Sequence, residues 1–237
     1  MSEQPGPEGT GQQGAWAKPV DALTAAAAPE GAPNLVEGKR LVGPIQGFGK
    51  MWQKTYKVRL SGVDTTPEAV VAAWREGFPS FWPKGNDFYT PLTGLDPGEV
   101  ALIKLAGPGG VKLKTGVMVL YSDDVSFTLM TPEGHMFAGW ITFSAHDEDG
   151  VTAAQTQVLM RAQDPLGELG LAFGGHGKEN RFWEQTLANL AASLGCEDAD
   201  VTTSVVCVDR KRQWSRATNV RHSVAIRSTL HMMKPGK

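Results

Sequence analysis

His135 is the polar residue best suited to acid–base chemistry. It follows the tight turn Pro132–Gly134, and strand alternation places it on the same face as Phe127 and Phe137. A histidine at a cavity mouth titrates near neutral pH and could act as a general acid or base. The alternative, which we favour, is a surface turn residue bonded to Glu133. His135 therefore enters as a candidate for catalysis, and the sequence leaves the catalytic residues otherwise unknown.

Signatures of metal, nucleotide and nucleophile sites are missing from the sequence. The five histidines are scattered at positions 135, 146, 176, 222 and 231, and neither HExxH nor CxxC occurs, so we expect no metal site and no cofactor. The segments Gly107–Gly110 and Gly174–Gly177 fit no phosphate-binding pattern and are typical of turns. Gly177-Lys178 could hold an anion at a helix start, although a plain helix entry is the simpler interpretation. No GxSxG elbow is present.

The role of several other polar residues depends on which face of the sheet they occupy. Gln155, Gln157 and Arg161 share one face of a strand. On a concave face they would anchor a ligand, whereas on a convex face they would meet solvent. We favour the convex face, because burying an uncompensated arginine is costly. Glu179, Arg181 and Glu184 have the pattern of a solvated helix face.

Composition limits the classes of protein. The chain has 237 residues, 41% of them apolar and 20% charged, which predicts a packed core and excludes wholesale disorder. No apolar run is long enough to span a membrane, and the net charge of −2 argues against a whole-surface nucleic-acid binder. Cys196 and Cys207 cannot form a disulfide framework. No secretory signal is evident, so we expect a cytoplasmic protein.

Both ends of the chain have a biased amino-acid composition. Residues 1–50 hold 9 of the 28 glycines and 6 of the 15 prolines, and we expect a disordered Gly/Pro/Ala-rich lead over residues 1–46, with Leu41–Phe48 as an alternative strap on the domain. Residues 197–237 form a C-terminal extension that has eight basic residues and no acid from Arg210 to Lys237. We favour its return to the acidic remainder of the chain. The alternative is docking on anionic lipid or nucleic acid.

Residues 47–196 have the pattern of one domain rich in antiparallel strands. Consecutive short connections predict a meander, with a further β-like run at 201–208. The predicted strands are Lys54–Leu60, Glu99–Ala106, Lys112–Tyr121, Val125–Thr131, His135–Ser144 and Val151–Ala162. A three-residue loop at Pro132–Gly134 would set Leu129 opposite Phe137 and Val125 opposite Ile141.

Two amphipathic helices accompany the strands. A capping box of Thr65 and Glu68 starts the first helix, and Gly195 ends the second, Lys178–Leu194. Asp164-Pro165 opens a short helix before it. A curved sheet with the long helix across its concave face would bury both apolar stripes, and it would leave a cavity wherever side chains do not fill the space. The stripes consist of Val70, Val71, Trp74 and Phe78 in the first helix and Trp183, Leu187, Leu190, Ala191 and Leu194 in the second.

This order of elements resembles the SRPBCC superfamily of START, birch-pollen-allergen and polyketide cyclase-like proteins, and most closely an uncharacterised bacterial branch of it. The resemblance covers about residues 51–195. It implies an α+β helix-grip fold, in which a curved antiparallel sheet wraps around a long C-terminal helix. The segments that carry it are TYKVRLSGVDTTPEAVVAAWREGF, TLMTPEGHMFAGWITFSA and GGHGKENRFWEQTLANLAASLG. The long lead and the basic extension depart from the family pattern.

The resemblance also implies a hydrophobic ligand in an internal cavity and, in some branches, cyclase or dehydratase chemistry. We therefore expect binding of a small hydrophobic molecule such as a lipid, a polyketide or another aromatic compound. The alternatives are an enzyme that uses His135, and an interaction module that docks through its basic extension. The sequence leaves the ligand and the oligomeric state open. The expected ligand-binding residues are Trp74, Phe78, Tyr121, Phe127, His135, Phe137, Ile141, Trp183 and Leu187.

Overall fold

The computed structural model describes residues 22–25, 34–107 and 110–233. Its centre is one antiparallel sheet with the strand order β2-β3-β4-β5-β6-β7-β1-β8. The strands are β1 (Met51–Arg59), β2 (Asp87–Tyr89), β3 (Val100–Ala106), β4 (Lys112–Ser122), β5 (Ser126–Met130), β6 (Phe137–Glu148), β7 (Val151–Ala162) and β8 (Val201–Asp209).

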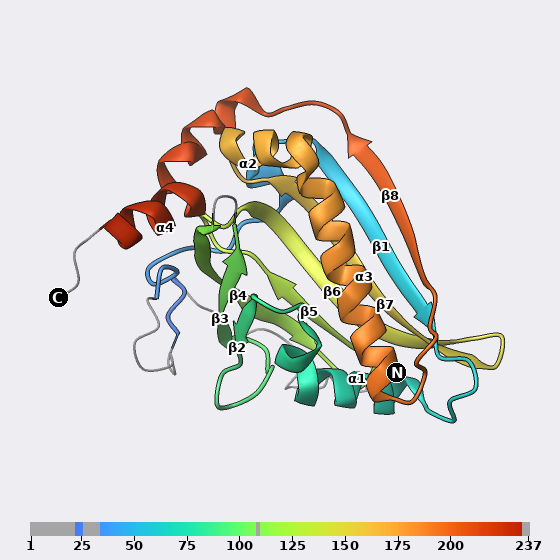
Figure 1. Cartoon of the computed structure of the whole chain (residues 1–237). Coiled ribbons are helices and arrows are strands. Elements are labelled where there is room, and N and C mark those ends of the chain that lie inside the picture. Colours follow the sequence, from blue (N-terminus) through green and yellow to red (C-terminus); the bar gives the residue numbers. More distant parts are fainter. Residues whose placement is uncertain (1–21, 26–33, 108–109, 234–237) are drawn as a thin grey trace, which may run out of the picture.

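The long helix α3 (His176–Ser193) lies across the concave side of this curved sheet, and α1 (Pro67–Gly77) covers one end of it (Figure 1). This is the helix-grip fold that the sequence predicted. At the opposite end lie α2 (Pro165–Gly170) and the π-helical turn η4 (Leu171–Gly175), which lead directly into α3. The 3₁₀ helices η1 (Pro44–Gln46) and η2 (Phe78–Phe81) are short connecting elements.

Both predicted helix starts are capped by a side chain, although the cap of α1 lies one residue later than predicted. Asp164 caps α2 as predicted, because its carboxylate accepts a hydrogen bond from the Gly167 amide at 2.9 Å. In α1 the cap is Thr66 rather than Thr65, and its hydroxyl accepts from the Ala69 amide at 3.2 Å. Pro67 then occupies the first helical position, where no amide donor is needed.

Side-chain alternation defines the two faces of the sheet. Phe143 on β6 lies opposite Thr156 on β7, and its ring contacts Trp74 of α1 with the centroids 5.2 Å apart. Phe143 and the alternate residues on its side therefore point to the concave face. Gln155 and Gln157 lie on the convex face, as we favoured.

Arg161 also lies on the convex face, but it is buried there at 2% exposure. Its guanidinium donates to the carbonyl oxygens of Gly49 and Lys211 and forms an ion pair with Asp209. The C-terminal extension thus supplies the compensation that burial of an arginine requires.

The β5–β6 hairpin keeps the predicted faces but not the predicted partners. Leu129 lies opposite Ile141 and Phe127 opposite Phe143, so each β5 residue pairs four positions further along β6 than the three-residue loop would set it. The loop is longer, because the Thr131 amide bonds the Gly139 carbonyl and His135 folds back inside the turn. Since the shift is even, Phe127, Leu129, Phe137, Ile141 and Phe143 still share one face.

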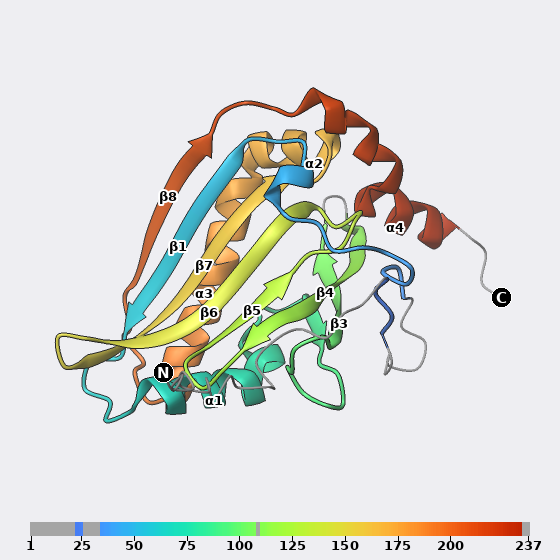
Figure 2. The ribbon, with the colours of Figure 1, turned by 180° about the vertical axis from the view of Figure 1, so that it is seen from behind.

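Our expectation of disorder over residues 1–46 is wrong for the part of this lead that the structure describes, residues 22–25 and 34–46. Residues 1–21 and 26–33 lie outside the described residues, but residues 22–25 and 34–46 pack on the convex side of the sheet, where Figure 2 shows the lead in blue. Leu23 and Val36 are almost completely buried, and Val42 bonds both Thr131 and Gly139 through its backbone. A few apolar anchors suffice to fix a segment whose composition is otherwise that of a flexible one. They form a second core with Val100, Leu102 and Met118.

The C-terminal extension begins inside the sheet. Its first segment is β8, which pairs with β1 from Val201 to Asp209, so the boundary expected at residue 196 is not a break in the sheet. The chain then forms η5 (Trp214–His222) and α4 (Val224–Met233). The Arg212 guanidinium pairs with Glu168 at 2.9 Å, and Asn219 donates to the carbonyl oxygens of Gln46 and Gln163. The extension therefore returns to its own chain, as we favoured.

Candidate functional site

Four of the expected ligand-binding residues form a filled core. Trp74, Phe78, Phe127 and Leu187 are all fully buried. Phe78 lies with its ring centroid 5.5 Å from that of Phe127, and Trp74 and Phe127 are 6.3 Å apart, both in edge-to-face geometry. These side chains fill the space between α1, α3 and the sheet. They are core residues at this end of the helix-grip.

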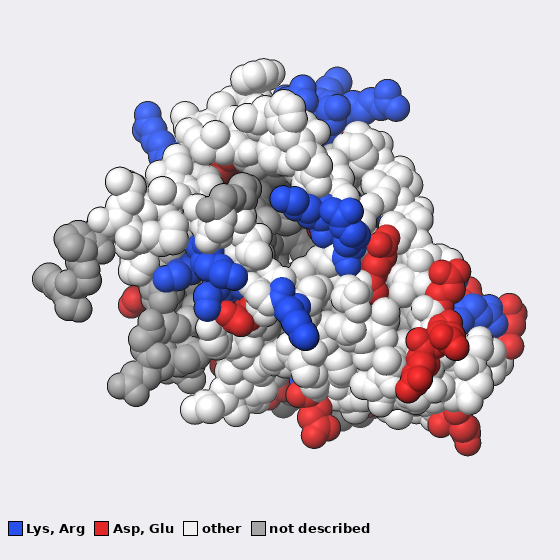
Figure 3. All heavy atoms as spheres, viewed as in Figure 1, with Lys and Arg blue, Asp and Glu red and all other residues white. Residues whose placement is uncertain are grey.

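Three other expected residues, Phe137, Ile141 and Trp183, are only half-buried. Each packs against the edge of the aromatic core, as do Leu105 and Phe182. Trp183 joins the core through Phe143, with ring centroids 5.5 Å apart. Figure 3 shows the surface hollowed between the first half of α3 and the β3–β4 hairpin, on the concave side of the sheet.

Tyr121 does not join this group. A bulge between Val119 and Tyr121 puts Tyr121 opposite Thr128, on the convex side of the sheet. Its hydroxyl donates to the Asp123 carboxylate, and this hydrogen bond raises the pKa of the phenol. The simple alternation that we applied along β4 misses the extra residue.

His135 is neither a surface residue bonded to Glu133 nor an exposed group at a cavity mouth. Its side chain is buried, and its Nδ1 accepts a hydrogen bond from the Phe137 amide at 3.0 Å. Burial lowers the pKa of the imidazole to about 4. The ring is therefore neutral at neutral pH and serves to close the long β5–β6 turn.

A buried polar cluster that the sequence analysis missed lies between β1 and α3. Lys54 has no exposed surface, and its Nζ lies 2.6 Å from Glu179 Oε2 and 2.9 Å from Asn180 Oδ1. The Tyr56 hydroxyl donates to the same Asn180 oxygen at 2.9 Å. The polar cluster thus consists of Lys54, Tyr56, Glu179 and Asn180, and it joins the sheet to the first turns of the long helix.

The electrostatics of the polar cluster follow from its burial. Desolvation raises the pKa of Glu179, although the ammonium of Lys54 opposes that rise. Burial, together with the nearby charges of Glu179 and Glu184, raises the pKa of Tyr56 far above its usual value. Tyr56 therefore remains a neutral hydrogen-bond donor at physiological pH.

Two buried polar atoms beside this cluster have no hydrogen-bond partner among the described residues. They are the Thr156 hydroxyl oxygen and His176 Nδ1. Thr156 lies directly opposite Tyr56 on the neighbouring strand, and the His176 ring contacts Trp52 with centroids 4.5 Å apart. Buried polar groups normally have partners, so these two atoms can still accept or donate a hydrogen bond.

The polar cluster and the half-buried apolar residues share one row of the sheet. Lys54 pairs with Val158 on β7, and Val158 pairs with Ile141 on β6. Since adjacent strands lie about 4.8 Å apart, the backbones of Lys54 and Ile141 are separated by about 10 Å. The polar cluster and the half-buried apolar residues are therefore close neighbours on the same face of the sheet.

A signal for the polar cluster was present in the sequence. Lys54 has the same strand parity as Tyr56, Val58 and Leu60, so it belongs to the apolar face of β1. Glu179 precedes Trp183 by four residues and so continues the buried stripe of α3 towards its N-terminus. We had assigned Glu179 to a solvated face because of its charge alone.

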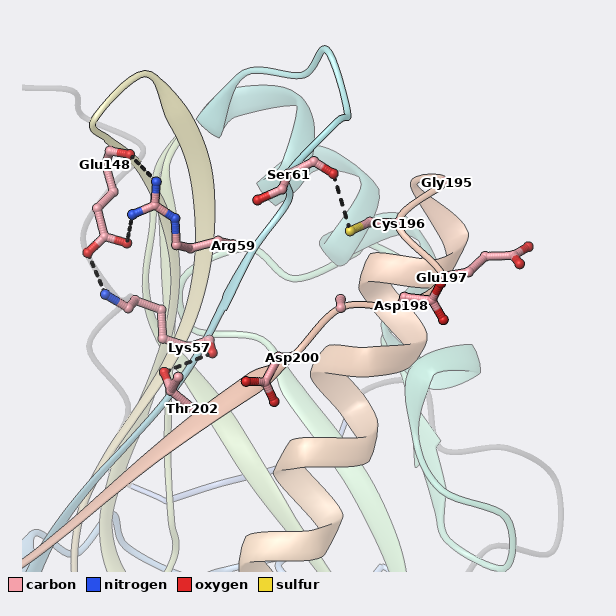
Figure 4. A pocket seen from close by; sticks show the side chains of 11 residues that line it. Lys57, Arg59, Ser61, Glu148, Gly195, Cys196, Glu197, Asp198, Asp200 and Thr202 are labelled. Carbon is pink, nitrogen blue, oxygen red and sulfur yellow. Dashed lines mark hydrogen bonds and ion pairs between the residues drawn. The ribbon is translucent and has the colours of Figure 1, made fainter.

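A second pocket lies at the other end of α3, between β1, the β6–β7 hairpin and the start of β8 (Figure 4). It has a volume of about 670 Å³. Its basic residues Lys57 and Arg59 are both paired with Glu148, and Cys196 Sγ lies 3.7 Å from the Ser61 carbonyl oxygen. This pocket is polar and open, and it contains none of the expected ligand-binding residues.

Two features are absent from the described part of the chain. Within residues 22–25, 34–107 and 110–233, no group of three or more His, Cys, Asp or Glu side chains is arranged to hold a metal ion. None of the helices in these ranges is both long and apolar enough to cross a membrane.

Comparison with known proteins gives structural similarities only. No protein-family model and no curated protein sequence matches this chain. The solved structures similar to it include protein Ms6760 from Mycobacterium smegmatis, with 13% identity, a TM-score of 0.43 and coverage of 60% of this chain and 90% of that one. Ara h 8.0201 has 10% identity, a TM-score of 0.44 and coverage of 61% and 97%.

The di-domain ARO/CYC StfQ from the steffimycin biosynthetic pathway is also similar, with 9% identity and a TM-score of 0.45. The match covers 60% of this chain and 50% of StfQ.

Proposed function

We propose that this protein binds a small, mostly apolar molecule between the first half of α3 and the concave face of the sheet. The observation that carries this proposal is the combination, on one face, of half-buried apolar side chains with buried polar atoms that lack partners. The apolar side chains are Leu105, Phe137, Ile141, Phe182 and Trp183.

The apolar side chains would form the walls of the site. A fully packed interior would bury residues of this kind completely, as it does at the α1 end. Their partial exposure, on the concave side of the sheet where Figure 3 shows a hollow, supports an opening lined by aromatic and aliphatic groups. Such walls favour a flat or chain-like apolar ligand through burial of its surface.

The polar cluster would orient the ligand. Because Lys54 is already paired with Glu179 at 2.6 Å, the cluster offers hydrogen bonds without an uncompensated charge. Thr156 and His176 supply the free positions. This favours a neutral ligand with a hydroxyl or carbonyl group over a carboxylate or an amine.

The aromatic core limits the length of the ligand. Trp74, Phe78 and Phe127 leave no exposed surface at the α1 end, so the ligand would enter from the hollow and extend towards β1. No observation favours the alternative of an enzyme that uses His135. Among the described residues the imidazole Nδ1 contacts only backbone atoms of Phe137.

Binding of the neutral fluorescent probe Nile red tests this proposal. The wild-type protein should bind the probe in an apolar environment, and compounds of the ligand class should displace it. Ile141→Asp should abolish binding, because a carboxylate in the wall must be desolvated. Thr142→Asp is the matched control, since the neighbouring half-buried residue points to the convex face and should leave probe binding unchanged.

Both variants require a circular dichroism spectrum like that of the wild type. If a folded Ile141→Asp protein binds the probe as well as the wild type does, the ligand site is not on this face.

A further inference from the structure

Exposed apolar residues are concentrated on one border of the molecule. Of the 14 large hydrophobic residues that are exposed in the described chain, eight belong to α2, η4, η5 and α4. We call this border the helical edge. Phe173 is 82% exposed and Trp214 is 74% exposed. The others include Leu166, Leu169, Leu230 and Met233.

The four elements of the helical edge are continuous in space. Figures 1 and 2 show α2 and the C-terminal helices along the same border of the sheet. The Arg212–Glu168 ion pair and the hydrogen bond from Asn219 to the Gln163 carbonyl fasten η5 and the segment before it to α2. These contacts hold the elements that carry the exposed side chains along one border of the molecule.

The helical edge, together with the segment 210–213 that leads into η5, carries unbalanced positive charge. Arg210, Lys211, Arg216 and Arg221 are exposed, and none of them forms an ion pair with an acid in the described residues. The acids nearby are already engaged, because Glu168 pairs with Arg212 and Asp209 with Arg161. Figure 3 shows some of the blue side chains along this border and others around the hollow, while most of the red ones lie towards the opposite end.

We propose that the helical edge docks on an anionic lipid surface. Aromatic and aliphatic side chains would enter the boundary between headgroups and acyl chains, while the arginine and lysine side chains meet the lipid phosphates. The combination matters, since neither a few apolar side chains nor a few charges alone gives stable attachment. This proposal is independent of the proposed ligand site.

The exposed apolar residues favour a lipid surface over a nucleic acid as the binding partner. A nucleic-acid surface would pair its phosphates with the basic residues but would give Leu169 and Met233 no apolar partner. A lipid surface satisfies both features at once.

Flotation of the full-length protein with lipid vesicles tests the proposal. The vesicles are phosphatidylcholine alone, or phosphatidylcholine with about 30% phosphatidylserine. We expect the protein to float with the anionic vesicles and to be released by salt. The double variant Leu169→Ser/Phe173→Ser should bind them at least about tenfold more weakly. The triple variant Arg210→Gln/Lys211→Gln/Arg216→Gln should lose about 100-fold in affinity.

Matched controls lie elsewhere on the surface. Leu92→Ser alters a residue that is 93% exposed, and Arg75→Gln/Lys84→Gln removes basic charge from half-buried Arg75 and exposed Lys84, both outside the helical edge. Both control variants should float like the wild type. Failure of the wild type to float with anionic vesicles would overturn the proposal. Unchanged flotation of Leu169→Ser/Phe173→Ser would also overturn it. So would release of this variant and of the wild type from anionic vesicles by duplex DNA to the same degree. Either of these two results would indicate a surface that binds polyanions in general.

Discussion

Lys54 on β1 and Glu179 on α3 form a buried ion pair, 2.6 Å between Nζ and Oε2, across the interface between the sheet and the long helix. The pair ties the helix to the sheet at the end where apolar packing is least complete. The pair is not an isolated contact, because Asn180 accepts hydrogen bonds from both Lys54 and Tyr56. The geometry of the helix against the sheet therefore depends on a polar contact, with consequences that can be measured.

The first prediction concerns this ion pair. Lys54→Met should lower the free energy of unfolding by about 3–5 kcal/mol, because it leaves the Glu179 carboxylate buried without its cation. The double variant Lys54→Met/Glu179→Leu should recover most of that loss. Urea denaturation of both variants and the wild type measures the difference. A loss below about 1 kcal/mol in the single variant would mean that the pair is open to water.

The second prediction concerns the pH dependence of stability through His135. Burial lowers the pKa of this imidazole from its usual 6.5 to about 4, so the unfolded chain binds the proton more readily than the folded protein. The contribution to stability is present above pH 6.5 and is lost as the pH falls towards 4. The difference in pKa corresponds to about 3 kcal/mol.

Denaturation of the wild type and His135→Asn at both ends of this pH range measures the effect. The free energy of unfolding should fall less between pH 6.5 and pH 4 in the variant. The change in the free energy of unfolding with pH reports protonation of His135. The absolute free energy of the variant also includes the packing that the substitution removes, so the changes with pH are compared. Parallel curves for the two proteins would contradict the assignment.

The third prediction concerns the N-terminal lead. Leu23→Ala should cost about 2–5 kcal/mol, because Leu23 is 1% exposed in the second core. Val36→Ala should destabilise in the same direction by a smaller amount. Leu92→Ala, at a residue that is 93% exposed, should have almost no effect. If thermal or chemical denaturation shows Leu23→Ala to be neutral, the lead does not pack on the sheet in solution.

The fourth prediction separates core from site. Trp74→Ala should cost about 3–5 kcal/mol in unfolding free energy, since Trp74 is completely buried among aromatic rings. Trp183→Ala should cost less, because Trp183 is half-buried, but it should weaken the binding of Nile red. Denaturation and probe titration of the two variants provide the comparison. Equal effects on stability with no effect on binding would place Trp183 in the core.

Much of the fold follows from periodicity alone. The strand β7 and the buried stripe of α3 were predictable because their alternation and helical spacing are uninterrupted. The faces of the β5–β6 hairpin were predictable too, since an error of an even number of residues preserves the side on which a residue lies. The partners across the hairpin were not, because the long turn around His135 has no signature in the sequence.

The site was harder to predict than the fold. The burial of Lys54 and Glu179 was not predicted, because both residues are charged and they lie far apart in the chain. Their pairing is evident only when the sheet and the helix are placed together. The bulge that turns Tyr121 outward depends on the backbone and not on residue type. The anchoring of the lead by Leu23 and Val36 was hidden by the glycines, prolines and alanines around them.

The position of β1 between β7 and β8 also affects how the chain must be made. Met51 pairs with Arg161 on one side and Asp209 on the other, so these two partners leave the ribosome 110 and 158 residues after it. Until then β1 has two unpaired edges and an apolar face, a state prone to association with other chains. Contacts of such long range slow folding. The sheet can therefore close only after most of the chain has been synthesised, and β1 is the segment that a chaperone would have to protect.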